Sequence, residues 1–207
     1  MNQEYKPLSS IWEGEDFELI ENMLQFYPRQ NPEIIIDTTY NEGRFWKKSK
    51  RKIISIDINP DMKAQYCCDN KQMPFADNFA DVLVYDPPHL TDHDTESSSK
   101  VWVERFGLKG TGNNICGEFD LFLKEAYRVL KPEGILLAKL ADNIHNHKFQ
   151  WVTVDFVNKC RTIGFMPCDC IVKVRKSSLI SSKWKNAHHA RRYHCNWIIC
   201  RKSNKCE

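Results

Sequence analysis

The sequence predicts an α/β fold in which a mostly parallel sheet is covered by helices on both faces. Four short, continuously apolar segments, at 34–37, 53–57, 82–86 and 134–140, have the composition of buried strands. Segments with helical periodicity alternate with them, and this alternation is typical of a parallel sheet. The length of 207 residues and the 42% hydrophobic content fit one globular unit, so we expect a single domain over 1–207.

Residues 15–27 are expected to form an amphipathic helix ahead of the first strand. Phe17, Ile20 and Leu24 recur there at spacings of three and four, which places them on one helical face. Pro28 ends the helix, because proline lacks the backbone N–H that a helix interior needs. The first two strands follow this helix directly.

The second half of the chain is expected to hold two further helices and two outer strands. A helix at 119–130 is followed by a Lys-Pro-Glu-Gly sequence, and the fourth strand begins at that glycine. Another helix is expected at 149–160, ending near Gly164. The segments at 168–174 and 194–201 have the pattern of outer or antiparallel strands.

Three of the predicted strands end on an aspartate, namely Asp37, Asp57 and Asp86. In open α/β sheets, ligands bind in the crevice beyond the carboxyl ends of the strands. Each aspartate alone is compatible with a role in capping the next turn. Together they indicate one shared cleft.

The most distinctive motif is the Asp-Pro-Pro-His sequence at 86–89. Proline fixes φ at about −65°, removes its own N–H and pushes the preceding residue to extended geometry. The carbonyl groups of Asp86 and Pro87 therefore have no nearby N–H from which to accept a hydrogen bond. The result is a rigid polar site that suits an amine. The stretch at 91–117 is rich in Ser, Thr, Asp, Asn and Gly, and we expect a mobile lid or substrate loop there.

The net charge of +3 hides a strong asymmetry. Residues 173–205 hold ten of the 30 Lys and Arg and no Asp or Glu, so the rest of the chain has 20 basic and 27 acidic residues, a net charge of −7. The basic segment also contains tryptophan, tyrosine and histidine. Basic residues interleaved with aromatic residues favour a nucleic-acid contact, and the alternative is a solvated tail.

The nine cysteines are expected to be reduced thiols. Their number is odd, no export signal precedes them, and no apolar stretch approaches the roughly 20 residues that span a bilayer. We therefore expect a cytoplasmic protein without a membrane partner. The pairs Cys168/Cys170 and Cys195/Cys200 have spacings that a metal site can use, but buried thiols are the favoured interpretation and no metal is expected.

The order of these elements resembles the class I S-adenosylmethionine-dependent methyltransferases over about residues 10–200. The segment 125–137 resembles the helix-turn-strand that follows the substrate strand in that family. The sequence at 86–89 resembles the D/N/S-P-P-aromatic motif of the amino-methyltransferases, which modify exocyclic amines of nucleic-acid bases. The resemblance implies a Rossmann-like, mostly parallel seven-stranded sheet with an antiparallel last strand, and S-adenosylmethionine as cofactor.

The resemblance also implies the residues of the site. In the family, the loop after the first strand, here the one that follows Asp37, holds the methionine part of the cofactor. The acid 20 residues later, here Asp57, accepts hydrogen bonds from the ribose, and the turn at 69–70 lies beside the adenine. A histidine stands where the family most often has an aromatic residue that stacks on the base. The implied catalytic residues are Asp86, Pro87, Pro88 and His89, and the implied cofactor-binding residues are Asp37, Thr38, Thr39, Tyr40, Gly43, Asp57, Ile58, Asp69 and Asn70.

The function implied by the resemblance is N-methylation of an exocyclic base amine, with DNA favoured over RNA and adenine N6 or cytosine N4 as the target. The alternatives are a transfer-RNA or ribosomal-RNA base methyltransferase, an inactive binding protein with this fold, and a small-molecule N-methyltransferase. The expected contacts with nucleic acid are Lys183, Trp184, Lys185, His188, His189, Arg191 and Arg192.

Overall fold

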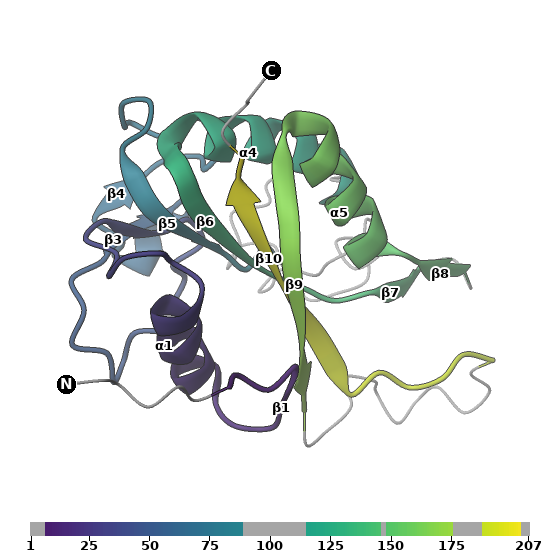
Figure 1. Ribbon diagram of the computed structural model, residues 1–207. Coiled ribbons are helices and arrows are strands. Elements are labelled where there is room, and N and C mark those ends of the chain that lie inside the picture. The colour runs from purple at the N-terminus through teal and green to yellow at the C-terminus, as the bar shows by residue number, and fades with distance from the viewer. Residues whose placement is uncertain (1–6, 89–114, 146–147, 176–187, 204–207) are drawn as a thin grey trace.

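A computed structural model describes residues 7–88, 115–145, 148–175 and 188–203 of the chain (Figure 1). The elements in chain order are β1 (Ile11–Trp12), α1 (Asp16–Phe26), β2 (Ile35–Asp37), β3 (Ile54–Asp57), the 3-10 turn η1 (Pro60–Met62), β4 (Tyr66–Cys67), β5 (Ala80–Tyr85), α4 (Ile115–Val129), β6 (Leu130–Leu140), β7 (Asn143–His145), β8 (Lys148–Gln150), α5 (Val152–Ile163), β9 (Phe165–Val174) and β10 (His194–Lys202).

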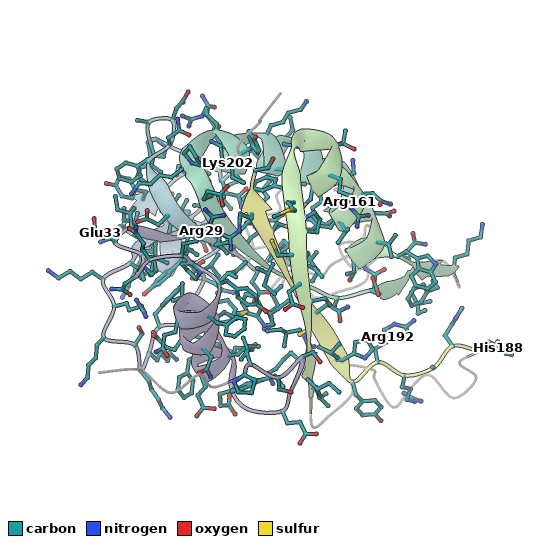
Figure 2. The ribbon with its side chains drawn as sticks, viewed as in Figure 1. Arg29, Glu33, Arg161, His188, Arg192 and Lys202 are labelled. Carbon is teal, nitrogen blue, oxygen red and sulfur yellow. The ribbon has the colours of Figure 1, made fainter. Side chains whose placement is uncertain are left out.

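Eight of the described strands form one sheet in the order β1-β9-β10-β6-β5-β2-β3-β4. Neighbours from β6 to β4 run parallel, whereas β10 is antiparallel to both β6 and β9. The predicted mostly parallel sheet with an antiparallel last strand is confirmed. Its eight described strands, one more than the seven predicted, include β1 and β4, which have two residues each and pair at its two edges. In Figure 2, Lys202 labels the last residue of β10, and Arg192 lies on the segment that leads into this strand.

Helices cover both faces of the sheet, as Figure 1 shows. Successive residues of a strand point to opposite faces. Ile35 and Val84 belong to the apolar cluster that contains α1, whereas Ile36 and Leu83 belong to the cluster that contains α4 and α5. Because both faces are buried, the central strands are apolar throughout.

The helix predicted for residues 149–160 begins later than expected, and the prediction is wrong at its first positions. Residues 148–150 pair with β7 as an antiparallel hairpin, so α5 begins only at Val152. The end of the helix is near the predicted residue. Gly164 has a φ of 116° and donates its N–H to the carbonyl oxygen of Cys160, 3.1 Å away. Glycine takes this left-handed conformation without steric strain.

Two further boundaries differ from the prediction. The strand expected at 134–140 begins at Leu130, because this residue already pairs with Ala80 of β5. Of the loop expected at 91–117, residues 115–117 belong to α4, and the remainder lies outside the described residues.

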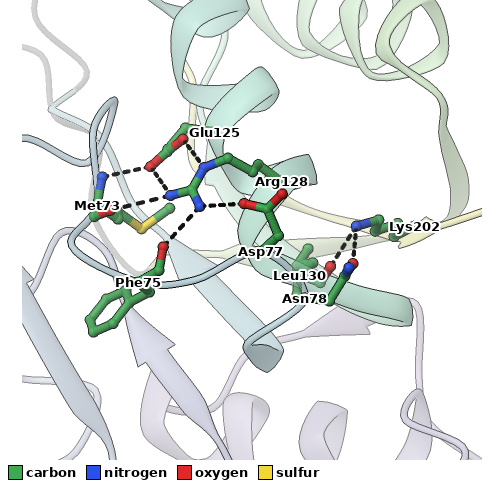
Figure 3. A network of polar contacts seen from close by, with 8 residues as sticks. All are labelled: Met73, Phe75, Asp77, Asn78, Glu125, Arg128, Leu130 and Lys202. Atoms are coloured by element: carbon green, nitrogen blue, oxygen red, sulfur yellow. Dashed lines mark hydrogen bonds and ion pairs between the residues drawn. The ribbon is translucent and has the colours of Figure 1, made fainter.

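Arg128, in the last turn of α4, holds the loop that leads into β5 (Figure 3). Its guanidinium donates hydrogen bonds of 2.8 and 2.7 Å to the two carboxylate oxygens of Glu125. It also donates to Asp77 at 2.7 Å and to the carbonyl oxygens of Phe75 and Met73 at 2.8 and 3.2 Å. The bonds from Arg128 lower the pKa of Glu125. The network therefore fixes the entry to β5 against α4.

Lys202 ties the last strand to the same loop (Figure 3). Its Nζ donates to the carbonyl oxygen of Leu130 at 2.6 Å and to the side-chain oxygen of Asn78 at 2.8 Å. Burial lowers the pKa of Lys202. The starts of β5 and β6 and the end of β10 are therefore joined at the amino edge of the sheet.

We expect the substitution Arg128→Met to lower the free energy of unfolding by roughly 2–3 kcal/mol, because a partly buried carboxylate and two carbonyl groups lose their donors. Urea denaturation measures this change. Lys124→Met, at an exposed position of the same helix, is the matched control and should change the free energy by less than about 0.5 kcal/mol. Equal effects of the two variants would contradict the role given to Arg128.

Candidate active site

The carboxyl ends of β2, β3 and β5 bring three aspartates to one edge of the sheet. Strand β2 lies between β5 and β3, and Asp37 at its end is aligned with Val84 and Ser55 of those neighbours. Asp57 ends β3, and Asp86 directly follows β5. The negative charges of Asp86 and Asp57 both act on Asp37, so the three carboxyl groups form one cluster.

Asp37 is almost completely buried, with 1% of its surface exposed. Its Oδ2 accepts a hydrogen bond of 2.6 Å from the indole of Trp46, and its Oδ1 accepts one of 3.0 Å from the backbone N–H of Thr39. Burial is the main cause that raises the pKa of Asp37 to about 7; the charges of Asp86 and Asp57 also raise it, and the two hydrogen bonds oppose the rise. A cation placed beside this group would favour its ionised form.

The loop that follows Asp37 is anchored to both neighbouring strands. Thr38 donates from its N–H at 2.9 Å and from its hydroxyl at 2.8 Å to the carbonyl oxygen of Val84 in β5. Tyr40 donates its N–H to the carbonyl oxygen of Ile56 in β3 at 2.9 Å. The loop therefore lies across the ends of β5 and β3.

Two residues of this loop have a left-handed backbone, Asn41 with a φ of 49° and Gly43 with a φ of 63°. A Cβ at Gly43 would lie 2.5 Å from the ring of Tyr40, so only glycine fits there. Asparagine tolerates the same conformation, which is why the turn needs only one glycine. The N–H of Asn41 donates to Asp57 Oδ2 at 2.7 Å, whereas its buried Oδ1 has no hydrogen-bond partner among the described protein atoms.

The turn after β3 holds the second carboxylate in a fixed position. Asp57 Oδ1 accepts a hydrogen bond of 2.9 Å from the N–H of Asn59. Together with the bond from Asn41, each oxygen of Asp57 thus accepts one backbone N–H and retains a lone pair for a second donor. Ile58, the next residue, exposes 48% of its surface beside this carboxylate.

Of the pair predicted to lie beside the adenine, Asn70 contacts the first loop. Its side-chain amide donates to the carbonyl oxygen of Thr38 at 3.1 Å. The carboxylate of Asp69 instead faces its own turn, where it accepts from the N–H of Lys71 at 2.9 Å and pairs with the ammonium group of that lysine at 3.3 Å. The structure therefore joins Asn70 to the site and directs Asp69 toward Lys71.

Asp86 is linked to the loop after β2 through its backbone. Its N–H donates to the hydroxyl oxygen of Thr39 at 2.7 Å. The side chain of Asp86 is 26% exposed, Pro87 behind it is buried and Pro88 is half-buried. Of the predicted catalytic residues, His89 lies outside the described residues.

A buried lysine that the sequence analysis treated only as part of a strand belongs to this site. The Nζ of Lys139 lies 3.7 Å from Asp86 Oδ2 and 2.8 Å from Asp16 Oδ2. It also lies 5.1 Å from the ring centroid of Phe45, and Trp197 donates to Asp16 Oδ1 at 3.2 Å. Burial lowers the pKa of Lys139, but the carboxylates of Asp86 and Asp16 more than offset this, and the net change is a rise. The sequence feature that points to Lys139 is that it is the one charged residue within the apolar strand segment 134–140.

The residues predicted to contact nucleic acid are described only in part. Lys183, Trp184 and Lys185 lie outside the described residues, whereas His188, His189, Arg191 and Arg192 lie on the segment that leads into β10. Asn196 of β10 is aligned with Leu140 at the end of β6. The segment therefore enters the sheet at the edge that carries the three aspartates.

The cysteine pairs differ from each other. Cys195 and Cys200 are buried as predicted, whereas Cys168 and Cys170 are exposed on β9, and the prediction that they are buried is wrong. The strand is next to the edge strand β1, and its pairing with β10 is irregular at Cys168, so neither neighbour covers these thiols. Within the described ranges, no group of three His, Cys, Asp or Glu side chains is placed to hold a metal ion. None of the described helices has the length and hydropathy of a membrane span.

Comparison with curated proteins gives one partial relative. No protein-family model matches the chain. The mitochondrial 2-methoxy-6-polyprenyl-1,4-benzoquinol methylase of Schizosaccharomyces pombe is 29% identical over 84 residues, which cover 41% of this chain and 26% of that protein. The chain therefore spans about a quarter of the length of this relative.

Comparison with solved structures concerns the fold. A Thermus thermophilus protein classed as a DNA modification methylase, in complex with S-adenosyl-L-methionine, is 16% identical to this chain. Its TM-score is 0.44 over 65% of this chain and 50% of that one. The [4+2]-cyclase SpnF is 14% identical with a TM-score of 0.58 over 93% and 86% of the two chains. A SAM-dependent methyltransferase from Methanosarcina mazei is 14% identical with a TM-score of 0.55 over 90% and 98%. The chain thus has the Rossmann-like fold of the class I S-adenosylmethionine-dependent methyltransferases.

Proposed function

We propose that this chain is an S-adenosylmethionine-dependent N-methyltransferase that acts on an exocyclic amine of a nucleic-acid base, with adenine N6 or cytosine N4 of DNA as the first candidates. The observation that carries the proposal is the position of Asp86. Its carboxylate stands at the open end of β5, in one cluster with Asp37 and Asp57 and beside the ammonium group of Lys139.

The residues present fit the cofactor. S-adenosylmethionine supplies a methyl group on a positively charged sulfur, and it carries an ammonium group and two ribose hydroxyls. Asp37 is a buried carboxyl group whose ionised form a cation would favour. Asp57 has acceptor capacity for the ribose hydroxyls. The buried Oδ1 of Asn41 has no hydrogen-bond donor among the described protein atoms, and a ligand can provide one. In the proposal, Ile58 and Asn70 border the adenine.

Asp86 performs the main step in the proposed reaction. It accepts an N–H of the target amine and orients the nitrogen lone pair toward the methyl group, while the carbonyl oxygen of Pro87 accepts the second N–H. When bound, the cofactor would supply the methyl carbon, which would form a bond to the nitrogen as its bond to sulfur breaks. The carboxylate stabilises the positive charge that develops on nitrogen and accepts one amine proton, which then passes to solvent. Positioning and electrostatics suffice, because the leaving group is a neutral thioether.

Lys139 acts as a positioning residue for Asp86. The distance of 3.7 Å is too long for a hydrogen bond, so the interaction is electrostatic. A cation at this position favours the ionised carboxylate, which accepts N–H groups better than the neutral acid does. The hydrogen bond from Lys139 to Asp16 fixes the ammonium group from the other side.

We expect Asp86→Ala to leave the affinity for S-adenosylmethionine within about threefold of the wild type and to reduce methyl transfer by at least about 100-fold. Calorimetry measures the first quantity. Tritiated cofactor, incubated with separate pools of DNA, transfer RNA, ribosomal RNA and small molecules, measures the second. Glu33→Gln, an exposed change at the opposite edge of the sheet, is the control and should retain both.

The label also decides between substrates. A methylated adenine or cytosine amine in DNA supports the proposal, and a methylated base amine in RNA moves it to the RNA alternative. Label that appears only in the small-molecule pool would refute the nucleic-acid part. Transfer by Asp86→Ala at the wild-type rate would refute the role of the carboxylate.

As the pH is lowered, we expect Lys139→Met to lose activity at a higher pH than the wild type does. The reason is that the variant lacks the cation that favours the ionised carboxylate. The variant should also be less stable than the wild type by about 2–4 kcal/mol at neutral pH, because two partly buried carboxylates lose the cation that pairs with them. The pH profile of transfer and urea denaturation at neutral pH provide the test. Lys131→Met, which removes a surface partner of Asp81, should leave the pH profile unchanged.

We expect the affinity for S-adenosylmethionine to fall as the pH decreases below about 7. The pKa of Asp37 is raised to about 7, so a cationic ligand that favours the ionised form must expel a proton at lower pH. Calorimetry from pH 5.5 to pH 8 in buffers of different ionisation enthalpy measures both affinity and proton release. Asp37→Asn should remove the pH dependence, and an equally steep dependence in this variant would exclude Asp37 as its source.

A further inference from the structure

We propose that the β7–β8 hairpin and the segment 188–193 form one binding surface for an unpaired nucleic-acid strand, with Trp151 as the stacking platform for a base that flanks the target. We call this surface the hairpin platform, and it consists of Ile144, Lys148, Phe149, Trp151, Arg192 and Tyr193. The inference deepens the proposed function and rests on it for the class of substrate.

The hairpin platform lies at the edge of the sheet that carries Asp86. Tyr85, the residue before Asp86, is aligned with Ala138 of β6, and β6 ends two residues later at Leu140. The hairpin begins at Asn143, and three residues of extended chain reach at most about 11 Å. Figure 1 shows the hairpin projecting beyond the sheet from this end of β6.

One contact joins the hairpin to the segment that precedes β10, and a second joins the start of β10 to the helix that follows the hairpin. The guanidinium of Arg192 stacks 4.1 Å from the ring centroid of Phe149 in β8. The side-chain amide of Asn196 donates to the hydroxyl of Thr153, at the start of α5, at 3.2 Å. Figure 2 shows Arg192 and His188 on the side of the molecule from which the hairpin projects. The two segments are therefore one surface.

The platform exposes three large apolar or aromatic side chains. Trp151 has 60% of its surface exposed, Tyr193 has 44% and Ile144 has 38%. The ring of Phe149 stands edge-on to Trp151, with centroids 4.6 Å apart. Arginine, phenylalanine and tryptophan thus follow one another across the surface, and bases of any sequence stack on such groups.

The charge of the platform suits a phosphate backbone. Residues 143–151 and 188–193 contain Lys148, Arg191 and Arg192 but no Asp or Glu. The nearest acid in the chain before the hairpin, Asp142, accepts a hydrogen bond of 2.8 Å from the N–H of residue 153. A basic surface with exposed aromatic rings favours a nucleic-acid strand, because phosphates pair with the cations while unpaired bases stack on the rings.

An unpaired strand is the favoured occupant for a geometric reason. The bases of a duplex are stacked on each other, so their faces are closed to an exposed indole. A base reaches Trp151 only where the strand is open, and an enzyme that modifies a base amine needs such an opening at its target. The stacking on Trp151 would hold the opened strand next to Asp86.

The test is the binding of fluorescein-labelled 20-nucleotide DNA and RNA of one sequence, single-stranded and as duplexes, to the full chain, followed by anisotropy over a range of salt concentrations. The variants are Trp151→Ala, Arg192→Met and Arg192→Lys. Leu121→Ala removes an equally exposed apolar side chain on α4 and serves as the control. Circular dichroism verifies that each variant folds.

We expect the wild type to bind single strands more tightly than duplexes. Trp151→Ala should weaken this binding about tenfold without changing the salt dependence. Arg192→Met should reduce the slope of log affinity against log salt by about one, and Arg192→Lys should restore that slope. Leu121→Ala should bind as the wild type does. The DNA and RNA arms show which backbone the platform prefers.

Each contrary result has a separate meaning. Wild-type binding that is unchanged by Trp151→Ala and Arg192→Met would overturn the hairpin platform and leave the proposed function intact. A preference for duplexes that depends on Trp151 would overturn the assignment to an unpaired strand. Absence of nucleic-acid binding by the wild type would overturn the nucleic-acid part of the proposed function together with this inference.

Discussion

The buried ammonium group of Lys139 is the interaction on which the arrangement of the site depends. It connects three elements, because it extends from β6, bonds Asp16 of α1 and faces Asp86 beyond β5. A charge with 8% of the residue exposed is costly unless it is paired, and here two carboxylates and the ring of Phe45 surround it. The helix on one face of the sheet is thereby coupled to the carboxylate at its edge, so packing and the proposed chemistry share one cation.

The central strands and their mostly parallel arrangement follow from local patterns. Short apolar runs ended by aspartate mark strands buried on both faces, since only a strand covered on both sides has no polar alternation. The Lys-Pro-Glu-Gly sequence separates α4 from the apolar part of β6. The three carboxyl ends converge because parallel strands that neighbour each other end at one edge, and the structure places Asp37, Asp57 and Asp86 accordingly.

Other features depend on contacts between distant residues and have no local pattern. Lys139 looks like an ordinary strand residue, because its partners Asp16 and Asp86 are 123 and 53 positions away. The hairpin of β7 and β8 was hidden by apolar residues at 149–156 that also suit a helix, and its pairing decides the boundary. In the loop after β2, Asn41 takes a positive φ that asparagine tolerates, and this conformation depends on the geometry of the turn rather than on composition.

The antiparallel direction of β10 has a consequence for how such a chain can diverge. Because β10 starts at the carboxyl edge, the segment before it and the hairpin after β6 reach the site from the C-terminal third of the chain, whereas Asp37 and Asp57 come from the first third. The two groups of residues lie on separate segments of the chain, so a substitution in one segment leaves the residues of the other in place. A lineage can exchange the later surface for another and retain the earlier loops, which makes altered selectivity an accessible evolutionary step.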